Sequence, residues 1–292
     1  ANLSRGAQAP GISQDAMLAQ VMAENSTLAA VGVNTAAIAA MSMSVNKNVP
    51  QGKDKQPLLT KFIWHNPKGT IVLLDMSDYM QDALNHYVAI TKSDREPKLA
   101  ATPFCPAGSL VLSDWEVVGE LVKGCHSVVM KNFWVSRIAR PDLYKPCADL
   151  ACHLHKWSRN DDKFLARVMG YMRRSKDFKM RGFVGDPLWE CELWLFVDAD
   201  FCGEVEHTKS TSGCWLCLVG NNTCFPIAWC GGKQGSTARS TTEAELISLA
   251  MGFFKISVPV LDLFDFILES LGYPPMHIRV FEDNKSTIQV IK

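Results

Sequence analysis

The spacing of hydrophobic and polar positions changes along the chain and divides it into three zones. Residues 1–60 are rich in Ala, almost lack aromatic side chains, and end in a polar stretch with Pro50 and Gly52 that is typical of a linker. Residues 61–185 carry apolar side chains mainly at helical spacing. In residues 186–292, short apolar runs indicate strands that alternate with amphipathic helices. We therefore expect a leader, a mostly helical region and a mixed α/β domain.

The middle zone is predicted to hold one strand, one loop and several helices. The β-branched run Thr70–Leu74 predicts the strand, and Ala100–Leu110, which contains Pro, predicts the loop. Ser77 is a candidate cap for the first helix. The expected helices are Ser77–Ile90, Glu116–Val122, Ser127–Ile138, Pro146–Trp157 and Asp161–Arg174.

The last zone is predicted to follow the order strand, two strands, helix, strand, helix. Leu193–Val197 is apolar at nearly every position, which predicts a central strand buried on both faces. The Ser240-Thr241-Thr242 segment offers hydroxyl side chains that can cap the N-terminus of the helix that follows it. The other expected elements are strands Cys214–Val219, Cys224–Trp229 and His277–Phe281, and helices Glu243–Phe254, Ile256–Leu271 and Asn284–Ile291.

The net charge of the chain does not indicate a class of binding partner, so any such partner must be inferred from local clusters of charge. Thirty basic residues balance thirty acidic ones, so the net charge does not indicate nucleic acid. A basic cluster follows the helix Asp161–Arg174. It is either a solvated helix end or a patch that tracks phosphates along a nucleic-acid backbone. The residues of this candidate nucleic-acid patch are Arg173, Arg174, Lys176, Lys179 and Arg181.

The ten cysteines are expected to be reduced, intracellular thiols, because most lie in apolar runs of a chain too long to need disulfides. Cys214, Cys217, Cys224 and Cys230 suggest a zinc site as an alternative. Cys214 and Cys217 would lie on opposite faces of a strand, which disfavours a shared ion.

The N-terminal zone contains one uncharged stretch, Thr27–Val45, that is about long enough to span a bilayer. It has few large aliphatic residues, so we expect a soluble Ala-rich helix or a leader rather than a membrane helix. No signal peptide is visible. The chain begins at Ala1 without Met, which suggests processing or a longer parent product.

Three acidic residues lie at the expected ends of these elements. Asp198 follows the first strand of the last zone, Glu245 lies in the first turn of its helix, and Asp283 follows the last strand. Such strand ends and helix starts are where α/β proteins build sites. Converging carboxylates would bind Mg²⁺ or Mn²⁺, although isolated acidic residues at these places are usually caps or solvated turns.

Five short motifs, in one order, resemble the ribonuclease H domain of copia-type retrotransposon Pol polyproteins. They are Phe196–Gly203 (FVDADFCG), Lys209–Gly213 (KSTSG), Pro226–Trp229 (PIAW) with Lys233-Gln234, Ser240–Leu246 (STTEAEL) and Glu282–Ser286 (EDNKS). Ala139–Leu143 (ARPDL) is similar to a segment that follows the reverse-transcriptase thumb of that family. Together the resemblance covers about Thr70 to Lys292.

The resemblance implies a ribonuclease H-like fold of class α/β (α+β). Its mixed five-stranded sheet with flanking helices would be truncated at its C-terminal end and preceded by a mostly helical connection region. It also implies that Asp198, Glu245 and Asp283 bind Mg²⁺ (or Mn²⁺) and hydrolyse the RNA strand of RNA–DNA hybrids. Glu245 would share a metal and steer the RNA 2′-hydroxyl. Asp200 and Glu243 would be neighbours rather than ligands.

Departures from the family pattern leave other functions open. The polymerase signature Tyr-x-Asp-Asp is missing, so no polymerase activity is expected, and the family's fourth acidic residue would lie after Lys292. If the resemblance holds for function, the chain is part of a Pol polyprotein. Alternatively, it would be an inactive, retroelement-derived protein that serves as a structural or binding subunit of a larger complex. A zinc-bound interaction module is a third possibility, and a membrane is not an expected partner.

Overall fold

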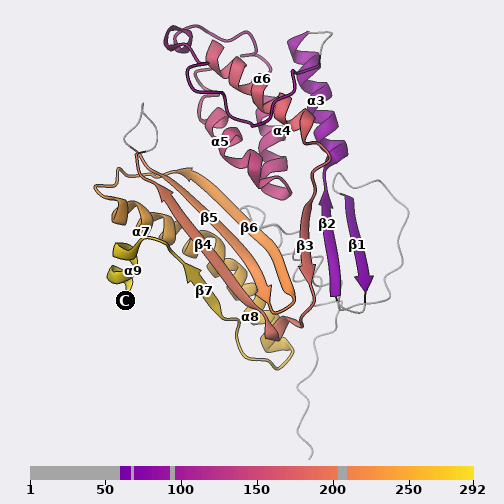
Figure 1. The fold of residues 1–292 in the computed structure, drawn as a ribbon, viewed down its shortest axis with the longest axis vertical. Coiled ribbons are helices and arrows are strands. Elements are labelled where there is room, and N and C mark those ends of the chain that lie inside the picture. The colour runs from indigo at the N-terminus through magenta and orange to yellow at the C-terminus, as the bar shows by residue number, and fades with distance from the viewer. Residues whose placement is uncertain (1–59, 67–68, 93–95, 203–208) are drawn as a thin grey trace, which may run out of the picture.

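The computed structural model describes residues 60–66, 69–92, 96–202 and 209–292 as a mixed α/β fold (Figure 1). Its seven strands form one sheet in the order β1-β2-β3-β6-β5-β4-β7. The strands are β1 (Thr60–Asn66), β2 (Gly69–Asp75), β3 (Met180–Val184), β4 (Glu192–Asp200), β5 (Thr211–Gly220), β6 (Thr223–Lys233) and β7 (Ile278–Phe281).

The helices lie in two groups. In Figure 1, α3–α6 form a layer beyond one end of the sheet, and α7 to α9 lie along β4 to β7. The helical elements are α3 (Ser77–Thr91), η1 (Leu112–Trp115), α4 (Cys125–Ile138), η2 (Pro141–Leu143), α5 (Tyr144–Cys152), α6 (Arg159–Arg174), η3 (Leu188–Glu190), α7 (Thr241–Gly252), the π-helix η4 (Phe253–Ser257), α8 (Val258–Ser270) and α9 (Lys285–Ile291). The Trp229 indole N–H of β6 joins the first group to the sheet, because it donates to the Ser136 carbonyl of α4 at 2.8 Å.

The sheet is larger than the five-stranded one expected from the sequence. Strands β1 and β3 were not predicted, and they pair with β2 on either side. Strand β3 then meets β6 through the single register pair Phe183–Cys224. The middle region therefore adds three antiparallel strands to the sheet as well as its helices. Short strands such as β3 escape prediction because pairing, rather than their local pattern, stabilises them.

Strand β4 is covered on one face, so the expectation of burial on both faces was wrong. Leu193, Leu195 and Val197 are buried, whereas Trp194 is half-buried and Phe196 is 39% exposed. The exposed rings lie on an open face of the sheet, where Phe196 and Phe281 stack with centroids 4.7 Å apart. The continuous apolar run thus reflects an aromatic surface rather than a second buried face.

The predicted helix Glu116–Val122 is wrong, because its backbone groups bond to the start of α6 instead of to each other. Gly119 N donates to the Trp157 carbonyl, and the Asp162 carboxylate accepts from two backbone N–H groups of the same segment. A side chain at Gly119 would come within 2.5 Å of the Ser158 carbonyl. This close approach requires glycine and leaves an irregular segment.

Helix α5 ends at Cys152, earlier than the expected end at Trp157. The chain must leave the helix there because Ser158 caps α6 in extended conformation, exchanging hydrogen bonds with Asp161 in a capping box. His153 Nδ1 also lies 2.7 Å from Asp161 Oδ1. These local interactions outweigh the helical pattern.

The remaining predicted elements are confirmed within a few residues, and one predicted cap is corrected. Ser240 caps α7 and accepts from the Glu243 N–H, as expected. Ser77 does not cap α3. Instead, the Asp75 carboxylate accepts from the Ser77 backbone N–H at 2.9 Å.

In the described part of the chain, the helical run Thr241–Ser270 is long and apolar enough to cross a membrane by length and composition. Its residues Val260, Leu263 and Phe264 are buried in the hydrophobic core. Packing onto the sheet therefore accounts for its apolar composition. The predictions for residues 1–59, including Thr27–Val45, lie outside the described residues.

Arg140 is buried, with 2% of its surface exposed, and it joins η2 to the residue that follows α6. It makes two hydrogen bonds to the Asp142 carboxylate, at 2.9 and 2.6 Å, and it donates to the carbonyl and hydroxyl oxygens of Ser175 at 2.8 and 2.7 Å. Burial would raise the pKa of Asp142, but Arg140 holds this pKa below its usual value. The Arg-Pro-Asp motif of the sequence is thus a structural clamp.

We expect Arg140→Met to lower the free energy of unfolding by about 2–5 kcal/mol, because it removes the positive charge paired with Asp142 and the four hydrogen bonds that Arg140 makes to Asp142 and Ser175. Urea denaturation measures this change. Arg174→Met, at an exposed position of α6, is the matched control and should cost less than about 0.5 kcal/mol. Equal losses in the two variants would contradict the clamp.

Candidate metal centre

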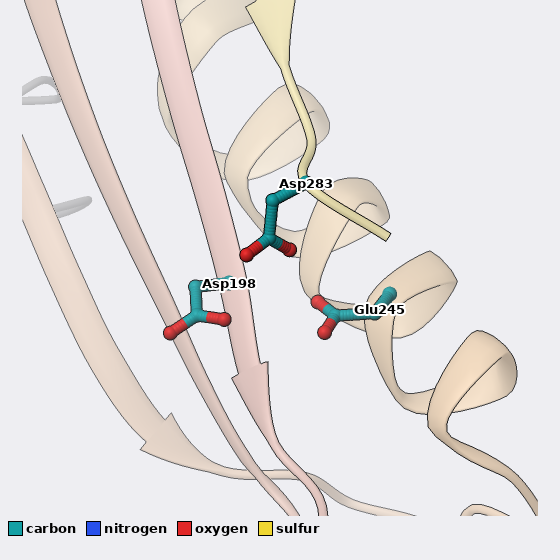
Figure 2. A group of neighbouring side chains, drawn as sticks. All are labelled: Asp198, Glu245 and Asp283. Carbon is teal, nitrogen blue, oxygen red and sulfur yellow. The ribbon is translucent and has the colours of Figure 1, made fainter. Parts of the chain in front are cut away.

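Asp198, Glu245 and Asp283 point toward one another from three different elements (Figure 2). Each offers a carboxylate oxygen, and these oxygens all lie within 4.8 Å of one another. Among the described residues, no other group of three or more His, Cys, Asp or Glu side chains meets this criterion. The structure therefore brings together the three carboxylates singled out in the sequence.

The parallel pairing of β4 with β7 positions the two aspartates. Phe196 lies opposite Phe281 in the register. Asp198 and Asp283 each follow two positions later, so the two carboxylates lie side by side at the same end of these neighbouring strands. Asp198 remains within β4, and Asp283 lies in the short segment between β7 and α9.

Helix α7 carries Glu245 to the same place. The Ser248 hydroxyl donates to the carbonyl of Asp198 at 2.7 Å and lies 3.2 Å from that of Gly213, which fixes the helix against β4 and β5. Glu245 precedes Ser248 by three positions, so both side chains lie on one face of the helix. Because α7 begins at Thr241, Glu245 lies in its second turn rather than the first.

Burial and like charge make the glutamate the most perturbed group of the site. Glu245 is 6% exposed, and its pKa is raised to about 7, first by burial and then by the charges of Glu282, Asp198 and Asp283. Its Oε2 atom is buried without a hydrogen-bond partner. A divalent cation would supply the missing positive charge, and carboxylate oxygens are the ligands that Mg²⁺ prefers. The residues present therefore fit such an ion.

Two polar residues that support the site had been given no role in the sequence analysis. Glu282, in the EDNKS motif, adds a fourth negative charge near Glu245. Gln234, in the Lys-Gln element, donates from Nε2 to Ser212 Oγ at 2.9 Å and to the Ala244 carbonyl at 2.8 Å. Both residues belong to the sequence motifs that surround the carboxylates, but only the fold reveals their contacts.

A groove of about 440 Å³ adjoins the carboxylates on the open face of the sheet. Asp198 and Asp200 line it together with the rings of Phe196 and Trp215. Lys145 lines the same groove from α5. Asp200 is thus a neighbour of the carboxylate group rather than a member. Glu243 is also outside it and accepts from the Arg239 backbone N–H.

The five basic residues of the predicted nucleic-acid patch are divided among α6, the turn after it and β3. Arg173 forms an ion pair with Glu96, and Lys179 forms one with Asp75 at 2.6 Å. Arg174 and Arg181 are exposed, and Lys176 donates to Gln81. Strands β6 and β5 lie between β3 and β4 in the sheet. The structure therefore separates the patch from the carboxylates.

The four cysteines of the zinc alternative do not form one cluster among the described residues. Cys214 Sγ lies 2.9 Å from Cys230 Sγ, whereas Cys217 Sγ accepts from the Trp215 indole N–H at 2.6 Å. All four are free thiols. The arrangement offers a pair of cysteines rather than a tetrahedral site.

Comparison with known proteins shows that the chain is similar to retroelement sequences. It is 32% identical over 111 residues (38% of the chain) to the retrovirus-related Pol polyprotein from transposon RE2 of Arabidopsis thaliana, and 25% identical over 153 residues (52%) to that from transposon RE1. The matches span 7% and 10% of those polyproteins. They support a retrotransposon Pol-related origin.

A further match is the secreted RxLR effector protein 161 of Plasmopara viticola, at 28% identity over 124 residues, which is 42% of this chain and 82% of that protein. No family model matches the chain. No solved structure matches it significantly.

Glu245→Gln is expected to stabilise the protein in a chelating buffer, much more at pH 8 than at pH 5. A carboxyl group whose folded pKa is raised stabilises the fold below its unfolded pKa, near 4.5, and this contribution is lost as pH rises through about 7. We expect a rise in Tm of a few degrees at pH 8, measured by differential scanning fluorimetry. The exposed Glu269→Gln is the control. A pH-independent difference would contradict the shifted pKa.

Proposed function

We propose that the chain is a divalent-metal-dependent ribonuclease H that hydrolyses the RNA strand of RNA–DNA hybrids. The observation that carries the proposal is the group of three carboxylates whose oxygens lie within 4.8 Å of one another. The Pol-related similarity and the motifs around each carboxylate support it. The strand order β6-β5-β4-β7, with β7 parallel to β4, is compatible with a ribonuclease H-like fold.

Asp198, Glu245 and Asp283 would hold the metal, with Mg²⁺ or Mn²⁺ as the expected ions. Bound at such a site, these ions activate water and stabilise the leaving oxygen in phosphodiester hydrolysis. The two exposed aspartates face the solvent side from which a phosphate would arrive. Glu245, which is buried and fixed by α7, would lie closest to the protein interior and orient the RNA 2′-hydroxyl.

The groove beside Asp198 offers a place for the nucleic acid. Its rings, Phe196 and Trp215, could contact sugars or bases, since aromatic faces bind nucleotides irrespective of sequence. Phosphates next to Asp198 and Asp200 would be repelled unless a cation lay between them. Substrate binding and metal binding are therefore expected to be mutually dependent, and the exposed Arg174 and Arg181 could bind a more distant part of the hybrid.

Cleavage of a labelled RNA–DNA hybrid in Mg²⁺ and in Mn²⁺ tests the proposal. We expect the wild type to cut the RNA strand, and Asp198→Asn to lower the rate at least about 100-fold, because it removes a direct ligand. Asp200→Asn changes an exposed carboxylate two positions along the same strand and should retain activity. Gel analysis of the labelled RNA over time measures the rates.

Two outcomes would reject this function. Equal cleavage by wild type and Asp198→Asn would place the activity elsewhere, in a contaminant or another site. No cleavage by wild-type protein that is folded, as shown by a cooperative melting transition, would favour the alternative of an inactive, retroelement-derived binding or structural subunit. The paired basic residues of the patch, Arg173 and Lys179, are in keeping with that alternative.

Mg²⁺ or Mn²⁺ should also raise the Tm of the wild type, because an ion that binds only the folded state stabilises it. Relief of the repulsion around Glu245 makes the rise larger at pH 8 than at pH 5. Asp283→Asn should abolish most of this effect in a titration followed by scanning fluorimetry. A rise that persists in that variant would place the ion at another site.

A further inference from the structure

We propose that Cys214 and Cys230 are a site of oxidative modification at which a reversible disulfide bond forms between strands β5 and β6. The two residues lie directly opposite each other in the antiparallel register, and their Sγ atoms are 2.9 Å apart. Both are free thiols in the structure. This inference does not depend on nuclease activity.

The backbone already meets the requirements of such a bond. Opposed residues of an antiparallel pair have Cα atoms about 4.5 or 5.5 Å apart, depending on their place in the hydrogen-bond pattern. Disulfides span Cα separations of about 4.4–6.8 Å. The two strands therefore need little movement to accommodate the bond.

The surroundings of Cys230 favour its reaction as the attacking thiolate. The hydrogen bond with the Cys214 thiol lowers the pKa of Cys230, against the effect of burial, and the Lys255 ammonium group lowers it further. The same contact raises the pKa of Cys214. Cys230 is half-buried, which leaves its thiol partly accessible to a small oxidant.

The oxidant we infer is a small-molecule disulfide of the glutathione class. The Cys230 thiolate attacks one of its sulfur atoms, forms a mixed disulfide and releases one glutathione thiolate. Cys214 then gives its proton to the released glutathione thiolate and attacks the Cys230 sulfur, which releases the second glutathione as a thiolate that takes up the proton lost earlier by Cys230. Two cysteine thiols are thereby oxidised to one disulfide, and one glutathione disulfide is reduced to two thiols.

The bond would form under helix α7. An added Cβ on Gly252 of this helix would lie 3.1 Å from the Cβ of Cys214. Cys214 also pairs with Val197 on β4, one position before Asp198. Oxidation would thus fix β5 to β6 directly beneath the helix that carries Glu245.

Peptide mapping of the full chain after incubation with oxidised glutathione tests the proposal. All four cysteines between Ser210 and Lys233 lie in one tryptic peptide, so chymotrypsin, which cuts after Trp215 and Trp229, is required to separate them. We expect a mass loss of about 2 Da on oxidation. We also expect a Cys214–Cys230 cross-linked peptide in the mass spectrum and its disappearance on reduction by dithiothreitol.

The exposed Cys152, Cys202 and Cys224 are internal controls, because exposure alone would favour their modification. Cys214→Ser should convert the product into a stable glutathione adduct on Cys230, whereas Cys152→Ser should leave the cross-link unchanged. Glutathione adducts on the three exposed cysteines, with Cys214 and Cys230 both still reduced, would overturn the proposal. Wild-type mapping alone decides between these outcomes if Cys214→Ser does not fold.

Discussion

The close packing of helix α7 onto β4 and β5 is the constraint on which the carboxylate group depends. Three like-charged side chains repel, so their own interaction cannot hold them together. The Ser248 hydroxyl bonds to the carbonyl of Asp198, and Gly252 lets the end of the helix approach Cys214 and Val197. The raised pKa of Glu245 shows that this packing works against electrostatics. The core thus supplies the energy that concentrates negative charge at one point.

The helical layer is organised by a different principle, in which buried charged groups replace regular backbone bonding. Arg140 bonds to the carbonyl of Ser175, and Asp162 accepts from the backbone of residues 120 and 121. Arg140, which is buried, contributes more in this setting than it would at a surface, because hydrogen bonds to a charged group are stronger where water is excluded.

Much of the C-terminal region was predictable because its local signals agree with its tertiary packing. Ser240 caps helix α7, which also packs onto the sheet. The strands that contain Phe196 and Phe281 are apolar runs that the sequence alone predicts. The three carboxylates were picked out by their place at the ends of predicted elements, and the motif resemblance then implied their role as metal ligands. Strand β3, the irregular Glu116–Val122 and the supporting Glu282 depend on contacts between residues far apart in sequence. No local pattern encodes such contacts.

The single pair Phe183–Cys224, which joins β3 to β6, divides the hydrogen-bond network of the sheet unequally. Ten register pairs hold β5 to β6, so the ladder is dense on one side of this seam and sparse across it. Amide hydrogen exchange in such a sheet follows cooperative units rather than the whole chain. The strands β1 to β3 are therefore expected to exchange their amide protons as a unit separate from β4 to β7. A protein built this way can vary its outer strands through evolution without disturbing the carboxylate group.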